Sequence, residues 1–423
     1  MLSLILIPSI DNAQITSSYG TQTDVNLSSI TPTLVWNYTV GKSVWSSPAV
    51  ANGIIYLGSL DTVFTGHQQI YTGDFYALNA TDGKKIWSDP IAESFSSPAI
   101  ADDIVYVGSY DHNVYALNAT NGAEIWSYKT NNAVETSPAV FNRIVYLSSN
   151  DGYLYALNAS NGEKLWDYPL GTDLQYGTPT TLSGCSPAVL NGVVYIAPSY
   201  YHIDTIGVLS PGTIVGNVYA LDATNGAKIW NYSIGNFDSS PTVADSKVYV
   251  GIGSDVVALK SSDGTQIWSF STGGSVGSSP TVLGGIVYVG SSDDNVYALN
   301  SSNGVKIWSY STNASFISSP AIAEGVAYVS SNDRNFYALN ATSGTPLWGY
   351  SINNTSSPVI ANNIVYVGSR DGNVYALSAP QASPLPSSIP EYSAIAILPL
   401  TLAILSLAVI LTLKHRKPSK LNQ

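Results

Sequence analysis

The sequence contains a single cysteine, Cys185, in 423 residues. One cysteine excludes an intrachain disulfide and a thiolate metal cluster, so the core and the topology alone must stabilise the fold. A lone cysteine is more often a small apolar core residue than a nucleophile. We therefore assign no reactive role to Cys185.

Charge is scarce too, since only 10% of residues are charged, the formal net charge is −12, and no basic cluster occurs before residue 414. Proteins that bind nucleic acid neutralise phosphates with clustered Lys and Arg. This composition excludes nucleic acid as a partner. The abundant residues include 29 Tyr, 9 Trp and 35 Gly, a composition typical of many short strands joined by tight turns.

The C-terminal region predicts a membrane anchor. Residues 392–413 are uncharged and apolar, and at about 1.5 Å per residue a helix of this length crosses a roughly 30 Å hydrocarbon core. The basic run Lys414–Lys417 follows at once, which places the tail 414–423 in the cytoplasm and the preceding chain outside the cell. The Pro- and Ser-rich residues 380–391 are predicted to form an extended stalk. At the other end, residues 1–31 are interpreted as a partial signal peptide and linker.

One pattern recurs through residues 32–379 with a period of about forty residues. Each copy contains a Ser-Pro pair with a short apolar strand, a second strand such as IVYVGS, a third such as VYALN, and a fourth that carries Trp. We name these strands A to D. Four such strands form the antiparallel blade of a β-propeller. Eight copies of Ser-Pro and of Ala-Leu predict an all-β, eight-bladed propeller.

The tryptophans test how the ring closes. The eighth copy, with Tyr375, runs into the stalk without a D strand, whereas residues 34–40 (LVWNYTV) form a D strand that has no A, B or C strand of its own. We expect this N-terminal strand to pair with the last blade and so remove an open edge. The eight predicted blade-docking tryptophans are Trp36, Trp87, Trp126, Trp166, Trp230, Trp268, Trp308 and Trp348.

These residues resemble the propeller repeats of pyrroloquinoline quinone (PQQ) dehydrogenases and of the outer-membrane assembly lipoprotein. The resemblance rests on the tryptophan-docking motif Ala-x-Asp-x-x-Thr-Gly-x-x-x-Trp, which matches Ala116–Trp126, Ala156–Trp166 and Ala298–Trp308. It implies that each Trp packs between neighbouring blades and carries no catalytic information. Asn replaces the Asp of the motif in several copies, where it is interpreted as capping the C-to-D turn.

Asparagine sequons outside this motif suggest N-glycosylation, as in a surface layer of archaeal type. For these positions a modified and an unmodified asparagine are equally consistent with the sequence. The candidate sites are Asn26, Asn37, Asn231, Asn313 and Asn354.

The resemblance also raises the possibility of a quinone cofactor. Dehydrogenases with this propeller hold PQQ over the axis with Ca²⁺, and many add a disulfide between adjacent cysteines, which a chain with one cysteine cannot form. Glu93, Glu135 and Glu163 follow no spacing that fits the metal ligands of the family. We therefore expect no cofactor and no metal, with PQQ and calcium as the alternative. Turns such as Asp111-His112-Asn113 and Asp293-Asp294-Asn295 are interpreted as hairpin chemistry rather than calcium ligands.

Extra sequence is concentrated in three loops, between Leu60 and Asp74, between Ala197 and Gly216, and between Asp167 and Gly184. The first two join strands B and C and the third joins D to A, so strand alternation places all three on one face. Aromatic side chains on scaffolded loops commonly bind a partner, although surface loops also tolerate insertions without a function. The candidate ligand-binding residues are His67, Tyr71, Tyr176, Tyr200, Tyr201 and His202.

No catalytic motif accompanies these loops, because the four histidines are isolated and no nucleophile elbow or HExxH sequence occurs. The sequence therefore favours a membrane-anchored extracellular propeller that binds a protein or a glycan. The rival hypothesis is a PQQ- and calcium-dependent dehydrogenase with its site over the axis. A purely structural component of the cell envelope is the third possibility.

Overall fold

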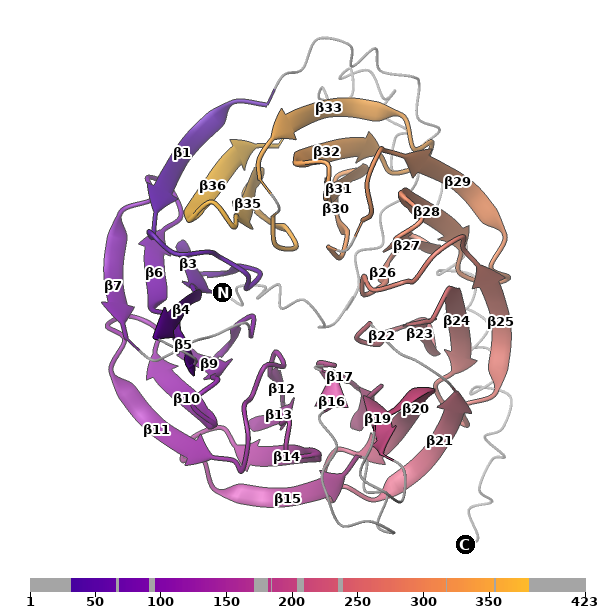
Figure 1. Cartoon of the computed structure of the whole chain (residues 1–423), viewed down its shortest axis with the longest axis horizontal. Coiled ribbons are helices and arrows are strands. Elements are labelled where there is room, and N and C mark those ends of the chain that lie inside the picture. The colour runs from indigo at the N-terminus through magenta and orange to yellow at the C-terminus, as the bar shows by residue number, and fades with distance from the viewer. Residues whose placement is uncertain are drawn as a thin grey trace, which may run out of the picture. The chain divides into compact units, whose positions relative to one another are not determined.

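The computed structural model describes residues 32–379, apart from 66–67, 91–95, 171–181, 184, 204–208, 235–238, 317 and 354. The regular secondary structure of these residues consists of β-strands, which form eight antiparallel blades around a central axis (Figure 1). The prediction of an all-β, eight-bladed propeller is confirmed. No helix within the described ranges is long and apolar enough to span a bilayer, and residues 392–413 lie outside those ranges.

The blades follow one another along the chain, each ordered from the axis outward. Blade 1 is β2 (Ala49–Ala51), β3 (Ile54–Gly58), β6 (Phe75–Asn79) and β7 (Lys85–Asp89). Blade 2 is β8 (Ala99–Ala101), β9 (Ile104–Gly108), β10 (Asn113–Asn118) and β11 (Glu124–Lys129). Blade 3 is β12 (Ala139–Phe141), β13 (Ile144–Ser148), β14 (Tyr153–Asn158) and β15 (Lys164–Pro169). Blade 4 is β17 (Ala188–Leu190), β18 (Val193–Ile196), β20 (Leu209–Asp222) and β21 (Lys228–Ile234).

The second half of the ring repeats the same order. Blade 5 is β22 (Thr242–Ala244), β23 (Lys247–Ile252), β24 (Asp255–Lys260) and β25 (Gln266–Ser271). Blade 6 is β26 (Thr281–Leu283), β27 (Ile286–Gly290), β28 (Asn295–Asn300) and β29 (Lys306–Ser311). Blade 7 is β30 (Ala321–Ala323), β31 (Val326–Ser331), β32 (Asn335–Asn340) and β33 (Pro346–Ser351). Blade 8 is β34 (Val359–Ala361), β35 (Ile364–Gly368), β36 (Asn373–Ser378) and β1 (Leu34–Thr39).

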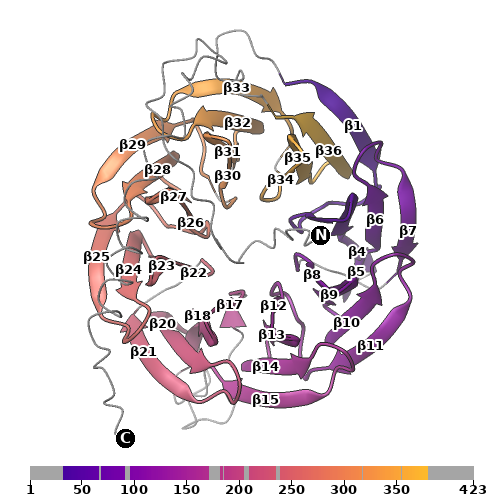
Figure 2. The same cartoon turned by 180° about the vertical axis from the view of Figure 1, so that it is seen from behind.

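The N-terminal strand closes the ring, as predicted. Strand β1 pairs antiparallel with β36, with Trp36 opposite Ala376, so one blade contains both ends of the propeller (Figure 2). Hydrogen bonds extend this pairing beyond the strand, because the Ser378 N–H donates to Thr33 O and the Val40 N–H donates to Gly372 O, each at 2.9 Å. The edge of β36 is therefore paired at the seam.

Two classes of turn shape each blade. The A-to-B turns have two consecutive residues of positive φ, such as Asn52 (50°) and Gly53 (74°), which is the type I′ geometry that suits the twist of a hairpin. The B-to-C turns have a single positive φ, as at Gly152 (92°) and Gly372 (85°). Positive φ in the B-to-C hairpins agrees with the sequence interpretation, but the two-residue I′ turns lie at the A-to-B connections.

The hydrophobic core consists of contacts between neighbouring blades. In one such cluster Tyr106, Val114 and Trp126 of blade 2 pack on Val145 and Leu157 of blade 3. Cys185 is a small buried residue at one of these boundaries, with its Sγ atom 3.6 Å from Ser239 O of blade 5. Because every blade covers its neighbour in this way, the core runs around the ring.

At seven of the boundaries between blades, one tryptophan links a blade to the next. Each Nε1–H donates to a main-chain carbonyl of the following blade at 2.9–3.1 Å, and a buried tyrosine hydroxyl donates to the same carbonyl. The indole also lies on a glycine of the C-to-D turn. A Cβ atom at Gly162, for example, would be 2.7 Å from Trp126, so only glycine fits beneath the ring. The accepting residues are Ala80, Ala119, Ala159, Ala223, Ser261, Ser301 and Ala341.

Candidate functional site

The B-to-C and D-to-A connections lie on one face of the propeller, which we call the loop face. Two additional hairpins extend from it. Strands β4 (Asp61–Thr65) and β5 (Gln68–Thr72) form a separate two-stranded sheet between the B and C strands of blade 1. In blade 4, β19 (Ser199–Ile203) pairs with the first half of β20. Within the part of the chain that the structure describes, the opposite face carries the short A-to-B and C-to-D turns.

The insertion between Asp167 and Gly184 pairs with the insertion of blade 4. Strand β16 (Leu182–Ser183), from the connection between blades 3 and 4, pairs with β19 through Leu182 opposite Tyr200. The structure therefore combines two of the three predicted insertions into one extended edge of blade 4. Blades 1 and 4 are separated by two blades, so the β4–β5 hairpin is a distinct element (Figure 1).

The candidate ligand-binding residues fall in these elements where the structure describes them. Tyr71 is in β5 opposite Thr62, and Tyr200 and Tyr201 are in β19 opposite Val215 and Ile214 of β20. His202 occupies the register shift between Tyr201 and Ile203. The blade 4 insertion thus brings three of the candidates into one strand, whereas Tyr71 belongs to another blade. His67 and Tyr176 lie outside the described residues.

Aspartates of the B-to-C turns are occupied by structural contacts. In blade 6, Asp293 accepts a hydrogen bond from the Tyr297 hydroxyl at 2.7 Å and from the Asn295 N–H at 3.1 Å, and Asp294 adopts a φ of 69°. Asp111, Asp151, Asp333 and Asp371 receive the same pair of bonds in their own blades. Each carboxylate therefore organises a hairpin, as the sequence interpretation has it.

These contacts also set the proton affinity of the pair. Burial, followed by the hydrogen bond to Asp293, raises the pKa of Tyr297 to about 12. Hydrogen bonds from Tyr297, Gly273 and Asn295 outweigh burial and lower the pKa of Asp293. The carboxylate is thereby held ionised and the phenol neutral, which suits a structural hydrogen bond rather than proton transfer.

A circle of serines surrounds the axis where the A strands begin. The N–H of the serine before each A-strand proline donates to the hydroxyl of the equivalent serine in the next blade, at 2.9–3.1 Å. Seven of these links are present, running from Ser47 through Ser97, Ser137, Ser186, Ser240, Ser279 and Ser319 to Ser357. The eighth, from Ser357 back to Ser47, is not formed.

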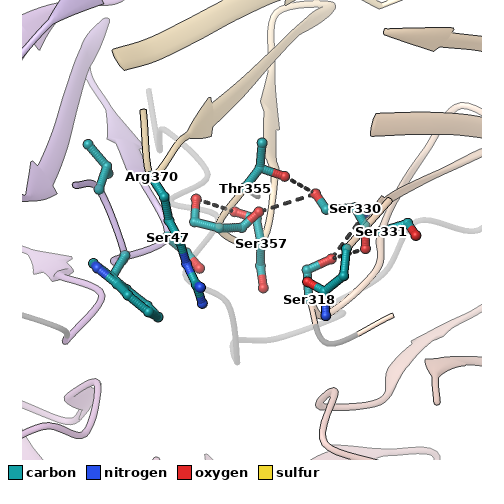
Figure 3. Close-up of a pocket in the computed structure, with 11 residues that line it drawn as sticks. Ser47, Ser318, Ser330, Ser331, Thr355, Ser357 and Arg370 are labelled. Carbon is teal, nitrogen blue, oxygen red and sulfur yellow. Dashed lines mark hydrogen bonds between the residues drawn. The ribbon is translucent and has the colours of Figure 1, made fainter. Parts of the chain in front are cut away.

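A hollow of about 180 Å³ lies at this interruption, between blades 7, 8 and 1 (Figure 3). Hydroxyl groups dominate its lining, and the Arg370 guanidinium lies over the Trp45 ring with its Cζ atom 3.5 Å from the ring centroid. We call this site the seam hollow. Its lining residues are Val44, Trp45, Ser47, Ser318, Ser330, Ser331, Asn332, Thr355, Ser356, Ser357 and Arg370.

Sequence reasoning overlooked the seam hollow, although two signals were present. Trp45 is the only one of the nine tryptophans outside the repeated D-strand position, and Arg370 is one of only four arginines. Neither signal locates a site by itself. The two residues meet only because the N-terminal strand completes blade 8.

A quinone cofactor held by calcium would need several oxygen ligands from the protein, so we asked whether the described acidic side chains could provide them. No group of three His, Cys, Asp or Glu side chains in the described ranges could share a metal ion. Glu135 lies on the loop face, where it accepts a hydrogen bond from Asn150, whereas Glu163 lies in a C-to-D turn on the opposite face. Glu93 is outside the described residues. Glu135 and Glu163 lie on opposite faces and do not fit a shared calcium site, and we derive no step through a quinone.

The sequons divide into two groups. In the docking motif the asparagine side chain is engaged in the turn, as where Asn118 Oδ1 accepts the N–H groups of Thr120 and Asn121 at 2.9 and 3.2 Å. Outside the motif, Asn37, Asn231 and Asn313 are exposed. Asn26 and Asn354 lie outside the described residues.

The architecture defines the class as an eight-bladed propeller fastened by tryptophans. The chain belongs to the family described as outer membrane protein assembly factor BamB, whose model matches residues 71–208 and 215–384. No curated protein sequence matches the chain.

Solved structures share the fold at low sequence identity. BamB from Moraxella catarrhalis is 18% identical with a TM-score of 0.63, and the match covers 82% of this chain and 98% of BamB. Quinohemoprotein alcohol dehydrogenase from Comamonas testosteroni is 15% identical with a TM-score of 0.65, over 83% of this chain and 78% of the enzyme. A europium-containing methanol dehydrogenase is 14% identical with a TM-score of 0.65, over 84% and 94%. This likeness to BamB and to two dehydrogenases shows the propeller fold alone.

Proposed function

We propose that this chain is a non-catalytic binding module whose loop face captures a protein or a glycan outside the cell. Residues 392–413 anchor it in the membrane with its C-terminus in the cytoplasm, and the stalk 380–391 holds the propeller away from the surface. The family description, an assembly factor, supports a role in holding partners.

The observation that carries this proposal is the one-sided distribution of inserted strands. Strands β4, β5, β16 and β19 all extend the loop face, while the described residues of the opposite face form short turns. Loops on a rigid scaffold are the usual location of binding residues. The occupied carboxylates of the B-to-C turns argue against catalysis by those groups.

Trimming the inserted hairpin tests the proposal. In the trimmed variant, residues 61–72 of the full chain are replaced by the short Asn-Asp-Gly turn of blade 3, and its capture of a cross-linked partner from a cell-surface extract is compared with that of the intact chain. The matched control carries Asp102→Asn with Asp103→Gly, which keeps a two-residue turn of positive φ on the opposite face. We expect the trimmed variant to lose capture and the control to retain it.

Equal capture by all three proteins would contradict a loop-face partner and favour a structural role. The same preparations should be mixed with PQQ and Ca²⁺ and assayed for heat stability and dye reduction with alcohols and sugars. A cofactor-dependent rise in melting temperature together with turnover would identify a quinone-dependent dehydrogenase instead.

A further inference from the structure

The interrupted serine circle leaves two hydrogen-bonding groups of the seam hollow without a partner among the described residues. In the other seven positions a serine N–H donates to the hydroxyl of the next serine, but neither the Ser357 N–H nor the Ser47 hydroxyl makes its equivalent bond within the described residues. Both residues line the hollow and are partly accessible (Figure 3). The hollow thus presents a main-chain donor and a hydroxyl to an incoming acceptor.

Arg370 supplies the charge of the hollow. Its guanidinium stacks on Trp45 and forms no ion pair or side-chain hydrogen bond with any described residue. Stacking uses the face of the guanidinium, so the N–H groups along its edge remain available to a carboxylate. The lining contains no Asp or Glu, and the neighbouring Asp371 is engaged with Asn373 and Tyr375. In a chain of net charge −12, this is a local site for an anion.

The remaining wall favours a sugar over a simple ion. Besides Ser47 and Ser357, four serines line the hollow together with Thr355 and Asn332, and their hydroxyl and amide groups can both donate and accept hydrogen bonds. Trp45 is 40% exposed despite the guanidinium on its ring, and it offers an apolar surface. Hydroxyls, an aromatic surface and one cation together match a pyranose that bears a carboxylate.

We propose that the seam hollow binds a hexuronic acid residue of an extracellular glycan, with its carboxylate on Arg370 and its hydroxyls on the serine-lined wall. The wall beside Ser47 and Ser357 consists of four further serines, Thr355 and Asn332, in addition to Trp45 and Arg370. The inference rests on the proposed binding function and names the ligand class for one site on the loop face. This site is separate from the β4–β5 and β19–β20 hairpins, none of whose residues line the hollow.

Titration calorimetry with glucuronate, glucose and acetate on the full chain in detergent tests the ligand class. Glucose lacks the carboxylate and acetate lacks the sugar. We expect glucuronate to bind roughly tenfold more tightly than either, which corresponds to about 1.4 kcal/mol. Equal affinity for glucuronate and glucose, or no binding of glucuronate, would overturn the proposal.

Arg370→Gln should remove the preference for glucuronate over glucose, and Trp45→Ala should weaken both sugars. Arg334→Gln is the matched control, because Arg334 is an exposed arginine of the loop face in blade 7 and does not line the hollow. If R370Q and R334Q bind glucuronate alike while melting at the same temperature as the parent, the assignment of Arg370 is wrong.

The outcomes separate this inference from the broader function. If trimming residues 61–72 abolishes partner capture and glucuronate does not bind, the proposed binding function is supported and the uronate site is refuted. If glucuronate binding depends on Arg370 and trimming has no effect on partner capture, the seam hollow is supported as a binding site and the β4–β5 hairpin has no role in binding the partner.

Discussion

At the scale of single residues, the repeated tryptophan forms the same contact between blades seven times, and the eighth copy, Trp348, departs from it. Trp126 donates to Ala159 O at 2.9 Å, in common with six other tryptophans. Trp348 is equally buried, at 7% exposure, but its Nε1–H has no partner among the described residues. Blade 8 takes its D strand from β1, so within the described residues no C-to-D turn follows β36 and no turn glycine contacts Trp348. The two sites therefore differ in one hydrogen bond and in the glycine turn that contacts the indole of Trp126.

Replacing each of these tryptophans by phenylalanine should separate the hydrogen bond from the buried area. Both Trp126→Phe and Trp348→Phe reduce the ring, but only the first removes a satisfied donor. We expect W126F to lower the free energy of unfolding by about 1 kcal/mol more than W348F. Denaturant unfolding of the two variants beside the parent measures the difference. Equal losses would mean that packing alone gives the tryptophan its role.

The sequence predicted these tryptophans because a repeated motif acts locally and identically in each blade. Pairs such as Trp45 and Arg370 could not be predicted in the same way. They occur once, lie at opposite ends of the propeller sequence, and meet only across the seam. The interruption of the serine circle is likewise invisible in the sequence, because Ser47 and Ser357 precede prolines like the other six serines.

At the scale of elements, the blades were predictable from alternating apolar residues and turn signals. The pairing of β1 was predictable because the eighth repeat lacks a D strand and residues 34–40 form one without other strands of its own. The extent of the inserted strands was not, since the pairing of β16 with β19 joins two separate connections and depends on how blades 3 and 4 meet. The closing strand holds the ring through main-chain pairing with β36 and through Trp36, which donates to Ala80 O of blade 1. Strand β1 therefore links blade 8 to blade 1.

Deleting residues 32–39 should open the ring. The edge of β36 and the Trp36 side of blade 1 would become exposed, and an unpaired edge promotes association between chains. We expect a large fall in melting temperature and concentration-dependent aggregation, measured by circular dichroism and light scattering. The trimmed β4–β5 variant is the control, since that hairpin forms its own sheet and should melt like the parent. A deletion variant that stayed monomeric with the parent melting temperature would show that blade 8 closes without β1.

At the scale of the whole molecule, buried tyrosines join every pair of blades that the tryptophans join. Their hydroxyls donate to the same carbonyls at 2.8–3.3 Å. Burial raises the pKa of Tyr56, Tyr249 and Tyr366 from 10 to about 12. The fold therefore depends on phenols that remain protonated, distributed around the ring.

Stability should consequently fall at high pH. Each of these tyrosines has a higher pKa in the folded state than in the unfolded state, so the folded protein holds more protons between the two values and its free energy of unfolding decreases as pH rises through them. We expect a melting temperature that changes little as pH approaches 10 and then drops steeply between pH 10 and 12. Tyr249→Phe should be less stable than the parent at neutral pH, because it loses the bond to Ser301 O, yet should lose less on going to pH 12. A parent protein whose melting temperature stays constant to pH 12 would show that these phenols ionise without disturbing the contacts between blades.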